Sequence, residues 1–252
     1  MDAPTLSLIA PLHNEAPNLP RLLEACAAAL ERTGESWEIL LIDDGSRDAS
    51  WSRIQALTEA DPSIGGIRFQ TNAGKTAALA AGFAAVRGDI VFMMDADLSH
   101  QPRHLADLDR ALDESDFAVG SRYVRGVSVL NWSILRLNLS IAANSYVRLV
   151  TGMPFSDCTS GFRGFRSGLL PLFVSSGIRA SGYAFLVEML YRVWRSGRSV
   201  SEVPIVFVER RSGASKISAG VLLESVLTPL RLSASSLLGT GADRRPPSQT
   251  PV

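Results

Sequence analysis

The chain of 252 residues has little cysteine, and neither sign of charge is in excess. Its two cysteines are too few for a disulfide framework, which fits a protein of the reducing cytoplasm. Lys and Arg together number 25, as do Asp and Glu, so no overall electric field points to nucleic acid as a partner. The first residues lack a basic stretch followed by an apolar one, so we expect no signal peptide. The length suits one α/β domain, or one and a half, with a sizeable core.

Several signatures of nucleotide-binding and metal enzymes are also missing. Gly74-Lys75-Thr76 resembles the end of a P-loop, but Phe69 stands where that motif needs a glycine, so a P-loop NTPase is rejected. No Gly-x-Gly-x-x-Gly follows the first apolar run, which argues against a dinucleotide enzyme. His100 and His104 are four residues apart, but the intervening Pro102 and the lack of the glutamate that a zinc-protease helix carries weaken that interpretation.

Apolar runs alternate along the chain with segments of helical period, which is typical of a mostly parallel sheet flanked by helices. We predict strands over residues 6–10, 38–42, 66–69, 90–94 and 116–120, and helices over residues 19–32, 50–60 and 76–86. Polar clusters follow the carboxyl ends of these strands, where open α/β sheets bind ligands. The sequence therefore predicts an α/β fold with its site at that edge.

The most informative cluster follows the fourth strand, where five apolar residues lead directly into Asp95 and Asp97. An ionised carboxylate at the edge of a core is costly to desolvate unless a cation or a hydrogen-bond donor meets it. Two such oxygen ligands suit Mg2+ or Mn2+ carrying a phosphorylated substrate. Asp is also common at helix N-caps and in surface loops, so the spacing alone leaves both interpretations open. The same holds for Asp43-Asp44-Gly45-Ser46, which also suits a turn and helix start.

Taken together, these clusters resemble a family. Six segments occur in the order found in glycosyltransferase family two, and the closest resemblance is to its dolichyl-phosphate (polyprenyl-phosphate) mannosyltransferases. The resemblance spans about residues 6–218. The segments are Pro11-Leu12-His13-Asn14-Glu15, Asp43-Asp44-Gly45-Ser46, Asp95-Ala96-Asp97-Leu98-Ser99-His100, Gly120-Ser121-Arg122-Tyr123, Asp157-Cys158-Thr159-Ser160-Gly161-Phe162-Arg163 and Arg210-Arg211-Ser212-Gly213-Ala214-Ser215-Lys216.

The resemblance implies a GT-A (Rossmann-like) fold over residues 1–216, with a nucleotide-sugar across the carboxyl edge of the sheet. Asp97 is expected to bind Mg2+ or Mn2+ directly, while Asp95 shares the metal or touches the sugar or nucleotide, and Ser99 adds at most a weak or water-mediated contact. Arg210 and Lys216 are expected to close over the phosphates, where cations stabilise a departing diphosphate. The full set expected at the nucleotide-sugar is Pro11, His13, Glu15, Ile42, Asp44, Asp95, Ala96, Asp97, Arg122, Arg210 and Lys216.

The resemblance also implies a site for the acceptor. Arg122, Arg136 and Ser140 are expected to hold the phosphate of a polyprenyl or dolichyl lipid, and Asp97, Arg122 and Arg136 to be catalytic. A lipid phosphate is already anionic, so it needs no strong general base to attack the sugar. A single in-line displacement would give a β-linked lipid-phosphate sugar. Asp157 is expected either to orient Arg122 or Arg163 or to serve in a turn.

The identity of the donor stays open between GDP-mannose, which we favour, and UDP-glucose. The family usually carries Tyr where this chain has His13, and the segment Val127-Ser128-Val129 lacks the glycines of many relatives. Transfer to a soluble glycan and a non-catalytic scaffold subunit are alternatives with the same fold. The intact acids Asp44, Asp95 and Asp97 argue against the scaffold.

Two apolar segments concern the membrane. Residues 129–150 mix aliphatic, aromatic and basic side chains, as an interfacial helix does, and residues 217–239 form a C-terminal amphipathic helix in the prediction. Both are also compatible with core helices, and the second falls short of the ~20 clean apolar residues of a membrane span. Residues 240–252 are predicted to be a disordered tail. We expect a peripheral protein of the cytoplasmic membrane face; the need for a separate membrane-anchoring subunit stays open.

Overall fold

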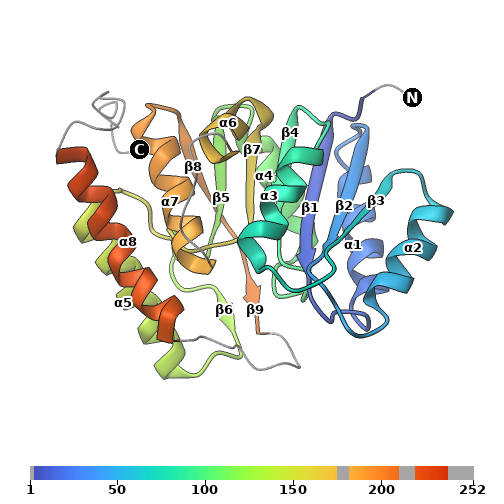
Figure 1. Cartoon of the computed structure of the whole chain (residues 1–252). Coiled ribbons are helices and arrows are strands. Elements are labelled where there is room, and N and C mark those ends of the chain that lie inside the picture. Colours follow the sequence, from blue (N-terminus) through green and yellow to red (C-terminus); the bar gives the residue numbers. More distant parts are fainter. Residues whose placement is uncertain (1–2, 175–181, 210–218, 238–252) are drawn as a thin grey trace.

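The structure is a computed structural model that describes residues 3–174, 182–209 and 219–237. Within these residues, helices cover both faces of a seven-stranded sheet, which gives three layers (Figure 1). The elements are β1 (Leu6–Leu12), α1 (Leu19–Glu31), β2 (Trp37–Asp43), α2 (Ser50–Ala60), β3 (Ile64–Arg68), α3 (Lys75–Ala85), β4 (Ile90–Met93), η1 (Pro102–His104), α4 (Leu105–Ala111), β5 (Phe117–Ser121), β6 (Val129–Leu130), α5 (Ile134–Thr151), β7 (Arg163–Arg166), η2 (Ser167–Leu169), α6 (Leu170–Val174), α7 (Gly182–Arg195), β8 (Val200–Pro204), β9 (Phe207–Val208) and α8 (Ala219–Leu237).

The sheet has the strand order β3-β2-β1-β4-β7-β5-β8. Neighbouring strands run parallel except at β7, which pairs antiparallel with both β4 and β5. The predicted mostly parallel sheet is therefore confirmed. Because β1, β2, β4 and β5 all point the same way, the polar segments that follow them meet at one edge.

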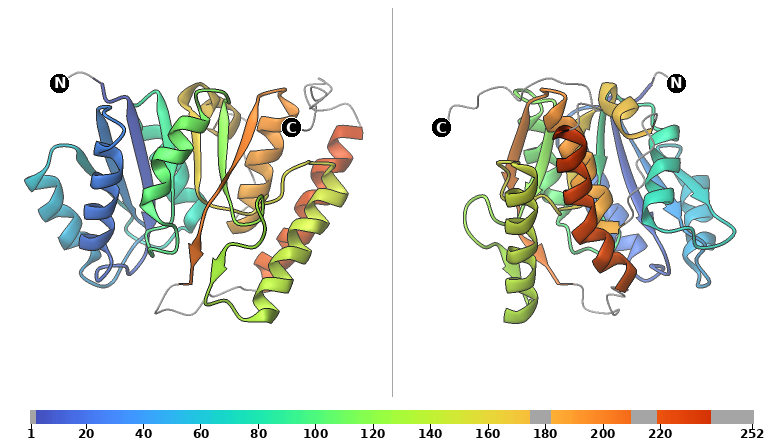
Figure 2. Two further views of the ribbon diagram at one scale, coloured as in Figure 1. Left: turned by 180° about the vertical axis from the view of Figure 1, so that it is seen from behind. Right: turned by 60° about the vertical axis from the view of Figure 1, so that its left-hand side comes forward.

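Alternate residues of each strand enter two separate cores, as the pleat of a strand requires. Ile9 and Ile42 pack with α3, α6 and α7 on one face, whereas Leu8 and Leu41 pack with α1, α2 and α4 on the other (Figures 1 and 2). Cys26 is buried in the second core, and burial raises the pKa of its thiol to about 12. Neither cysteine forms a disulfide.

Helices α5 and α8 lie side by side at the β8 end of the sheet (Figures 1 and 2). The hydroxyl of Tyr146 on α5 donates to the carbonyl of Val226 on α8 at 2.8 Å. The prediction of one helix over residues 129–150 is wrong at its start, because Val129–Leu130 form β6, which pairs with β9. The helix begins at Ile134 after Ser133, whose hydroxyl accepts the N–H of Arg136.

Within the predicted C-terminal helix, residues Ala219–Leu237 form α8, which continues through Pro229, and its amphipathic role stays a prediction. Residues 217–218 and 238–239 of that prediction, and the predicted tail at 240–252, lie outside the described residues. Among the described helices, none is both long and apolar enough to cross a membrane.

Candidate active site

A cleft of about 290 Å³ opens at the carboxyl edge of the sheet. Eight of the predicted site residues line it, together with four that the sequence did not single out. The lining residues are Pro11, Leu12, His13, Glu15, Lys75, Asp95, Ala96, Asp97, Ser99, Arg136, Tyr183 and Phe207. The fold therefore brings eight predicted residues to one space, whereas the predicted acceptor residues Arg122 and Ser140 do not line it.

The acidic loop after β4 is held by its own hydrogen bonds. Oδ1 of Asp97 accepts the N–H of Ser99 at 3.0 Å and its hydroxyl at 2.5 Å. Between them Leu98 has a φ of 61°, a left-handed conformation that a bulky residue rarely adopts. Such strain is typical of functional loops whose surroundings fix the backbone. The Asp97 carboxylate is thus oriented before any ligand arrives.

The other end of this loop is held by His100. Its Nδ1 lies 3.2 Å from the backbone nitrogen of Asp95 and accepts that N–H. Burial lowers the pKa of His100, against the opposing charge of Asp95, so its imidazole is neutral at pH 7 and the proton sits on Nε2. The ring stacks on Phe162 and meets Phe207 edge-on, with centroids 5.2 and 5.3 Å apart. His100 therefore fixes the backbone at Asp95.

The donor set of the cleft fits a hard divalent cation. Asp95 and Asp97 both line the cleft. Within the described ranges, no group of three or more His, Cys, Asp and Glu side chains could hold a metal by itself. Two carboxylates completed by substrate phosphates and water are a common arrangement for Mg2+. Because the Ser99 hydroxyl donates to Asp97, its contact here is with that carboxylate, and its role toward a metal stays a prediction.

The residues predicted to bind the nucleoside follow β1 and β2. Nδ1 of His13 lies 2.8 Å from the carbonyl oxygen of Asp44 and donates to it. The Asp44 carboxylate is buried and accepts the N–H groups of Ala73 and Gly74 at 2.7 and 2.9 Å. Neither Asp44 nor Ile42 lines the cleft. The Ile42 side chain is fully buried in the core, and the expected contact of Ile42 with the nucleoside stays a prediction.

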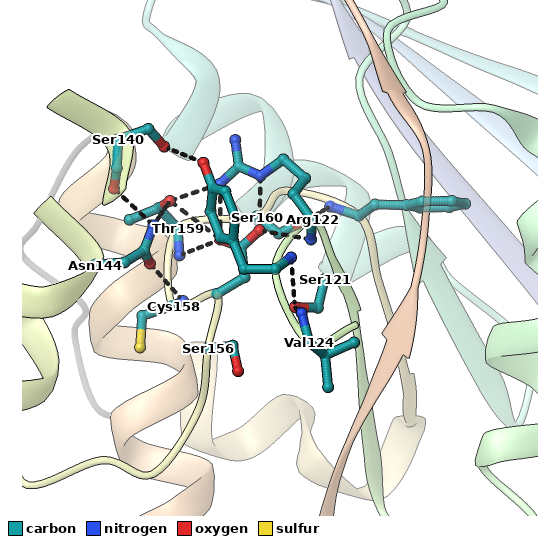
Figure 3. Close-up of polar contacts among 12 residues, drawn as sticks. Ser121, Arg122, Val124, Ser140, Asn144, Ser156, Cys158, Thr159 and Ser160 are labelled. Carbon is teal, nitrogen blue, oxygen red and sulfur yellow. Dashed lines mark hydrogen bonds and ion pairs between the residues drawn. The ribbon is translucent and has the colours of Figure 1, made fainter. Parts of the chain in front are cut away.

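Arg122 is fixed by a buried ion pair. Its Nε and Nη2 donate to the two carboxylate oxygens of Asp157 at 2.6 and 2.7 Å. Nη2 also donates to the hydroxyl of Thr159 at 2.8 Å (Figure 3). Burial alone would raise the pKa of Asp157, but the charge and hydrogen bonds of Arg122 outweigh it and lower that pKa. Asp157 therefore orients Arg122. Arg163 instead donates to backbone carbonyls, among them that of Ser160 at 2.9 Å.

Trp132 joins the two arginines predicted to hold the acceptor phosphate. The guanidinium carbons of Arg136 and Arg122 lie 4.5 and 5.5 Å from the centre of its ring. Arg136 also pairs with Glu209. Within the described part of the chain, the indole Nε1 of Trp132 is a buried donor with no hydrogen-bond partner. Ser140 joins the group indirectly, because its hydroxyl accepts that of Tyr123 at 2.7 Å (Figure 3).

Comparison with known proteins places the chain in a family. Residues 7–171 match the family described as glycosyl transferase family 2. The chain belongs to glycosyltransferase family 2. It is 36% identical to an undecaprenyl-phosphate mannosyltransferase of Micrococcus luteus over 88% of this chain and 91% of that protein. It is 38% identical to a polyprenol monophosphomannose synthase of Mycolicibacterium smegmatis over 87% of this chain and 83% of that protein.

A solved structure supports the fold of this family 2 chain. Glucosyl-3-phosphoglycerate synthase from Mycobacterium tuberculosis, in complex with Mn2+, UDP and glucosyl-3-phosphoglycerate, superposes with a TM-score of 0.67. The match covers 92% of this chain and 80% of that one at 18% sequence identity. The predicted GT-A fold is confirmed.

Sequence reasoning missed several residues of this family 2 site. Lys75, Tyr183 and Phe207 line the cleft, and Glu209 pairs with Arg136. Lys75 offered a signal, since it follows a glycine and opens an alanine-rich helix after a strand, as ligand-binding residues of α/β folds do. Phe207 and Glu209 reach the site through the pairing of β9 with β6, for which the sequence holds no clear pattern. Arg210 and Lys216 lie outside the described residues.

Proposed function

We propose that this family 2 glycosyltransferase transfers mannose from GDP-mannose to a polyprenyl or dolichyl phosphate. One observation carries the proposal: the carboxylates Asp95 and Asp97 share a cleft with Arg136, and Trp132 connects Arg136 to the buried Arg122. A cleft with acids for a metal-bound diphosphate and arginines for a second phosphate suits two anionic substrates. Mannose and a polyprenyl acceptor are the substrates in the names of the two relatives.

In the donor half of the proposed site, Pro11, His13 and Glu15 bind the nucleoside and the backbone at Ala96 approaches the sugar. Asp44 acts indirectly, by holding the loop before α3. Asp95 and Asp97 hold Mg2+ or Mn2+, which when bound neutralises negative charge on the diphosphate. Arg210 and Lys216, which lie outside the described residues, stay in the proposal as phosphate ligands.

In the acceptor half, Arg122, Arg136 and Ser140 hold the lipid phosphate. The buried N–H of Trp132 offers a further donor, since a ligand oxygen there would satisfy it. An oxygen of the lipid phosphate forms a bond to the anomeric carbon while the bond from that carbon to the nucleoside diphosphate breaks. The electron pair leaves with the diphosphate, and no proton has to move. Displacement from the opposite side inverts the anomeric centre and gives a β-linked product.

The acceptor also places the protein at a membrane surface in this proposal. Ile134, Leu135 and Leu149 on α5 are 78%, 80% and 85% exposed, and Leu223, Val226 and Leu230 form an exposed apolar stripe on α8. Paired helices with such faces suit the headgroup region of a bilayer. The proposed organisation is thus a GT-A domain over residues 1–216 with α5 and α8 on the cytoplasmic face of the membrane, with or without a separate anchoring subunit.

A donor panel tests the proposal. The purified protein is incubated with Mg2+ or Mn2+, polyprenyl phosphate and, in turn, GDP-mannose, UDP-glucose and other nucleotide-sugars, and lipid products are identified by mass spectrometry. We expect polyprenyl-phosphate mannose from GDP-mannose alone. A product from UDP-glucose would reassign the donor, and a lipid-linked sugar from no donor would contradict the proposed function.

A further inference from the structure

Lys75 places a cation inside the cleft, next to the proposed metal ligands. It is the first residue of α3, and its ammonium pairs with Oδ1 of Asp95. Both residues line the cleft with Asp97. The Lys75 side chain is 33% exposed and that of Asp95 is 32% exposed, so the pair faces the space that a ligand would enter.

Three separate segments hold the pair in place. The start of α3 is fixed because the Asp44 carboxylate accepts the N–H groups of the two residues before Lys75. The backbone of Asp95 is fixed by its hydrogen bond to His100. The backbone of Gly161 lies against the pair, since a Cβ there would be 3.3 Å from Nζ of Lys75 and 3.7 Å from Oδ1 of Asp95. The fold therefore directs the ammonium to this carboxylate.

An ammonium and a divalent cation compete for one carboxylate. A metal ion that binds Oδ1 of Asp95 has to displace Nζ of Lys75, because two cations at that distance repel each other. A nucleoside diphosphate changes the balance, since its anionic oxygens offer the displaced ammonium new charge-assisted hydrogen bonds. With both ligands bound, the metal ion pairs with Asp95 and the diphosphate pairs with Lys75. The metal ion alone is repelled by the Lys75 ammonium, and the diphosphate alone lies next to the Asp95 carboxylate without a metal ion between them.

We propose that, without ligands, the Lys75 ammonium binds the Asp95 carboxylate at the position that the divalent cation would take. When a nucleotide enters, the ammonium moves to the diphosphate and leaves Asp95 to the cation. Cation and nucleotide therefore bind cooperatively. This inference rests on the proposed metal-assisted donor site but is independent of the sugar and the acceptor. Because binding free energies are linked, each ligand raises the affinity for the other by the same factor. The protein would then bind little metal until a donor is present.

Mn2+ binding without substrate tests the inference. Titration calorimetry or electron paramagnetic resonance gives the affinity for Mn2+ alone, then for GDP with and without Mn2+, in wild type and in Lys75→Met. We expect Lys75→Met to bind Mn2+ alone about fivefold more tightly or better, as loss of a partly exposed competing charge predicts. We also expect the factor by which Mn2+ raises GDP affinity to fall in this variant.

Three matched variants complete the test. Arg32→Met also removes one positive charge, from the exposed end of α1. It should leave unchanged both the affinity for Mn2+ alone and the factor by which Mn2+ raises the affinity for GDP. Lys75→Arg keeps the charge and should keep the cooperativity. Lys75→Gln is a second neutral variant, for use if Lys75→Met folds poorly. Equal Mn2+ affinity in wild type and the folded neutral variants would overturn the inference, as would an unchanged coupling factor or no Mn2+ binding even with GDP. Transfer of an unexpected sugar would overturn only the proposed donor.

Discussion

Arg122 carries a positive charge into a part of the protein from which water is nearly excluded. Its side chain is 8% exposed and that of its partner Asp157 is fully buried. Burying two charges is costly, so such a pair is weak support for stability as such. The bidentate geometry does fix the direction of the guanidinium. We interpret Asp157 as the residue that positions Arg122 for the proposed acceptor phosphate.

Asp157→Asn tests that interpretation. The amide keeps the shape but removes the charge, which leaves the Arg122 guanidinium buried without a counter-ion. We expect the free energy of unfolding to fall by about 3 kcal/mol and the KM for polyprenyl phosphate to rise several-fold, measured by urea unfolding and by initial rates. Glu38→Gln is the control, because Glu38 is a buried carboxylate paired with Arg87 at the opposite edge of the sheet. It should lower stability and leave that KM unchanged; an equal rise of KM in both variants would contradict a positioning role.

The same pair predicts a pH dependence of stability. The pKa of Asp157 is lowered in the folded protein, whereas an unfolded Asp titrates near about 3.9. The unfolded state therefore binds the proton more readily, so the contribution of this carboxylate is fully present above pH ~4 and is lost as the pH falls through the folded-state pKa. The stability difference between wild type and Asp157→Asn, measured by urea unfolding from pH 3 to 7, should be constant above pH ~5 and shrink toward pH 3. A difference that grows as the pH falls would contradict this assignment.

At the scale of elements, α5 connects the proposed acceptor site to the exterior. Asn144 on its inner face accepts the N–H of Cys158 at 2.8 Å and donates to Thr159 at 3.3 Å, which ties the helix to the loop that carries Asp157 (Figure 3). Its outer face carries Leu135 and Leu149, both largely exposed. One helix thus presents polar groups to the site and apolar groups to the surroundings, as an interfacial helix does.

A double substitution tests the outer face. Leu135→Gln with Leu149→Gln should weaken binding to vesicles of phosphatidylglycerol and phosphatidylcholine at least tenfold, because two apolar side chains no longer leave water. Sedimentation of vesicles with bound protein measures the effect. Val174→Gln, an exposed apolar position at the end of α6, is the control and should bind as wild type does. Unchanged vesicle binding of the double variant would contradict a membrane contact of α5.

At the scale of the whole molecule, the alternation of strands and helices was predictable. Buried strands and helices each place apolar residues at a characteristic spacing in the sequence. The helix predicted over residues 50–60 is α2 to the residue, and the strands predicted before Asp44, Asp95 and Arg122 do end at the edge that holds the site. The parallel arrangement then gathers their polar ends without further information. This is why eight predicted residues line one cleft.

What the sequence could not predict depends on long-range pairing and on side-chain direction. The antiparallel β7 is a strand of only four residues between β4 and β5, and β6 and β9 have two residues each, too short for a periodic signal. Phe207 and Glu209 come to the site through that pairing. Ile42 was placed by resemblance alone, although the pleat of β2 turns its side chain into the core.

The proposed transfer is measured by the rate at which labelled mannose passes from GDP-mannose into polyprenyl phosphate with Mn2+ or Mg2+ present. Wild type should form labelled lipid, Asp97→Asn should lose at least about a hundredfold in rate because charge stabilisation in the transition state is lost, and Asp113→Asn, an exposed acid after α4, should match wild type. Full activity of Asp97→Asn would contradict the metal role. The absence of labelled lipid with folded wild type would contradict the proposed transfer itself.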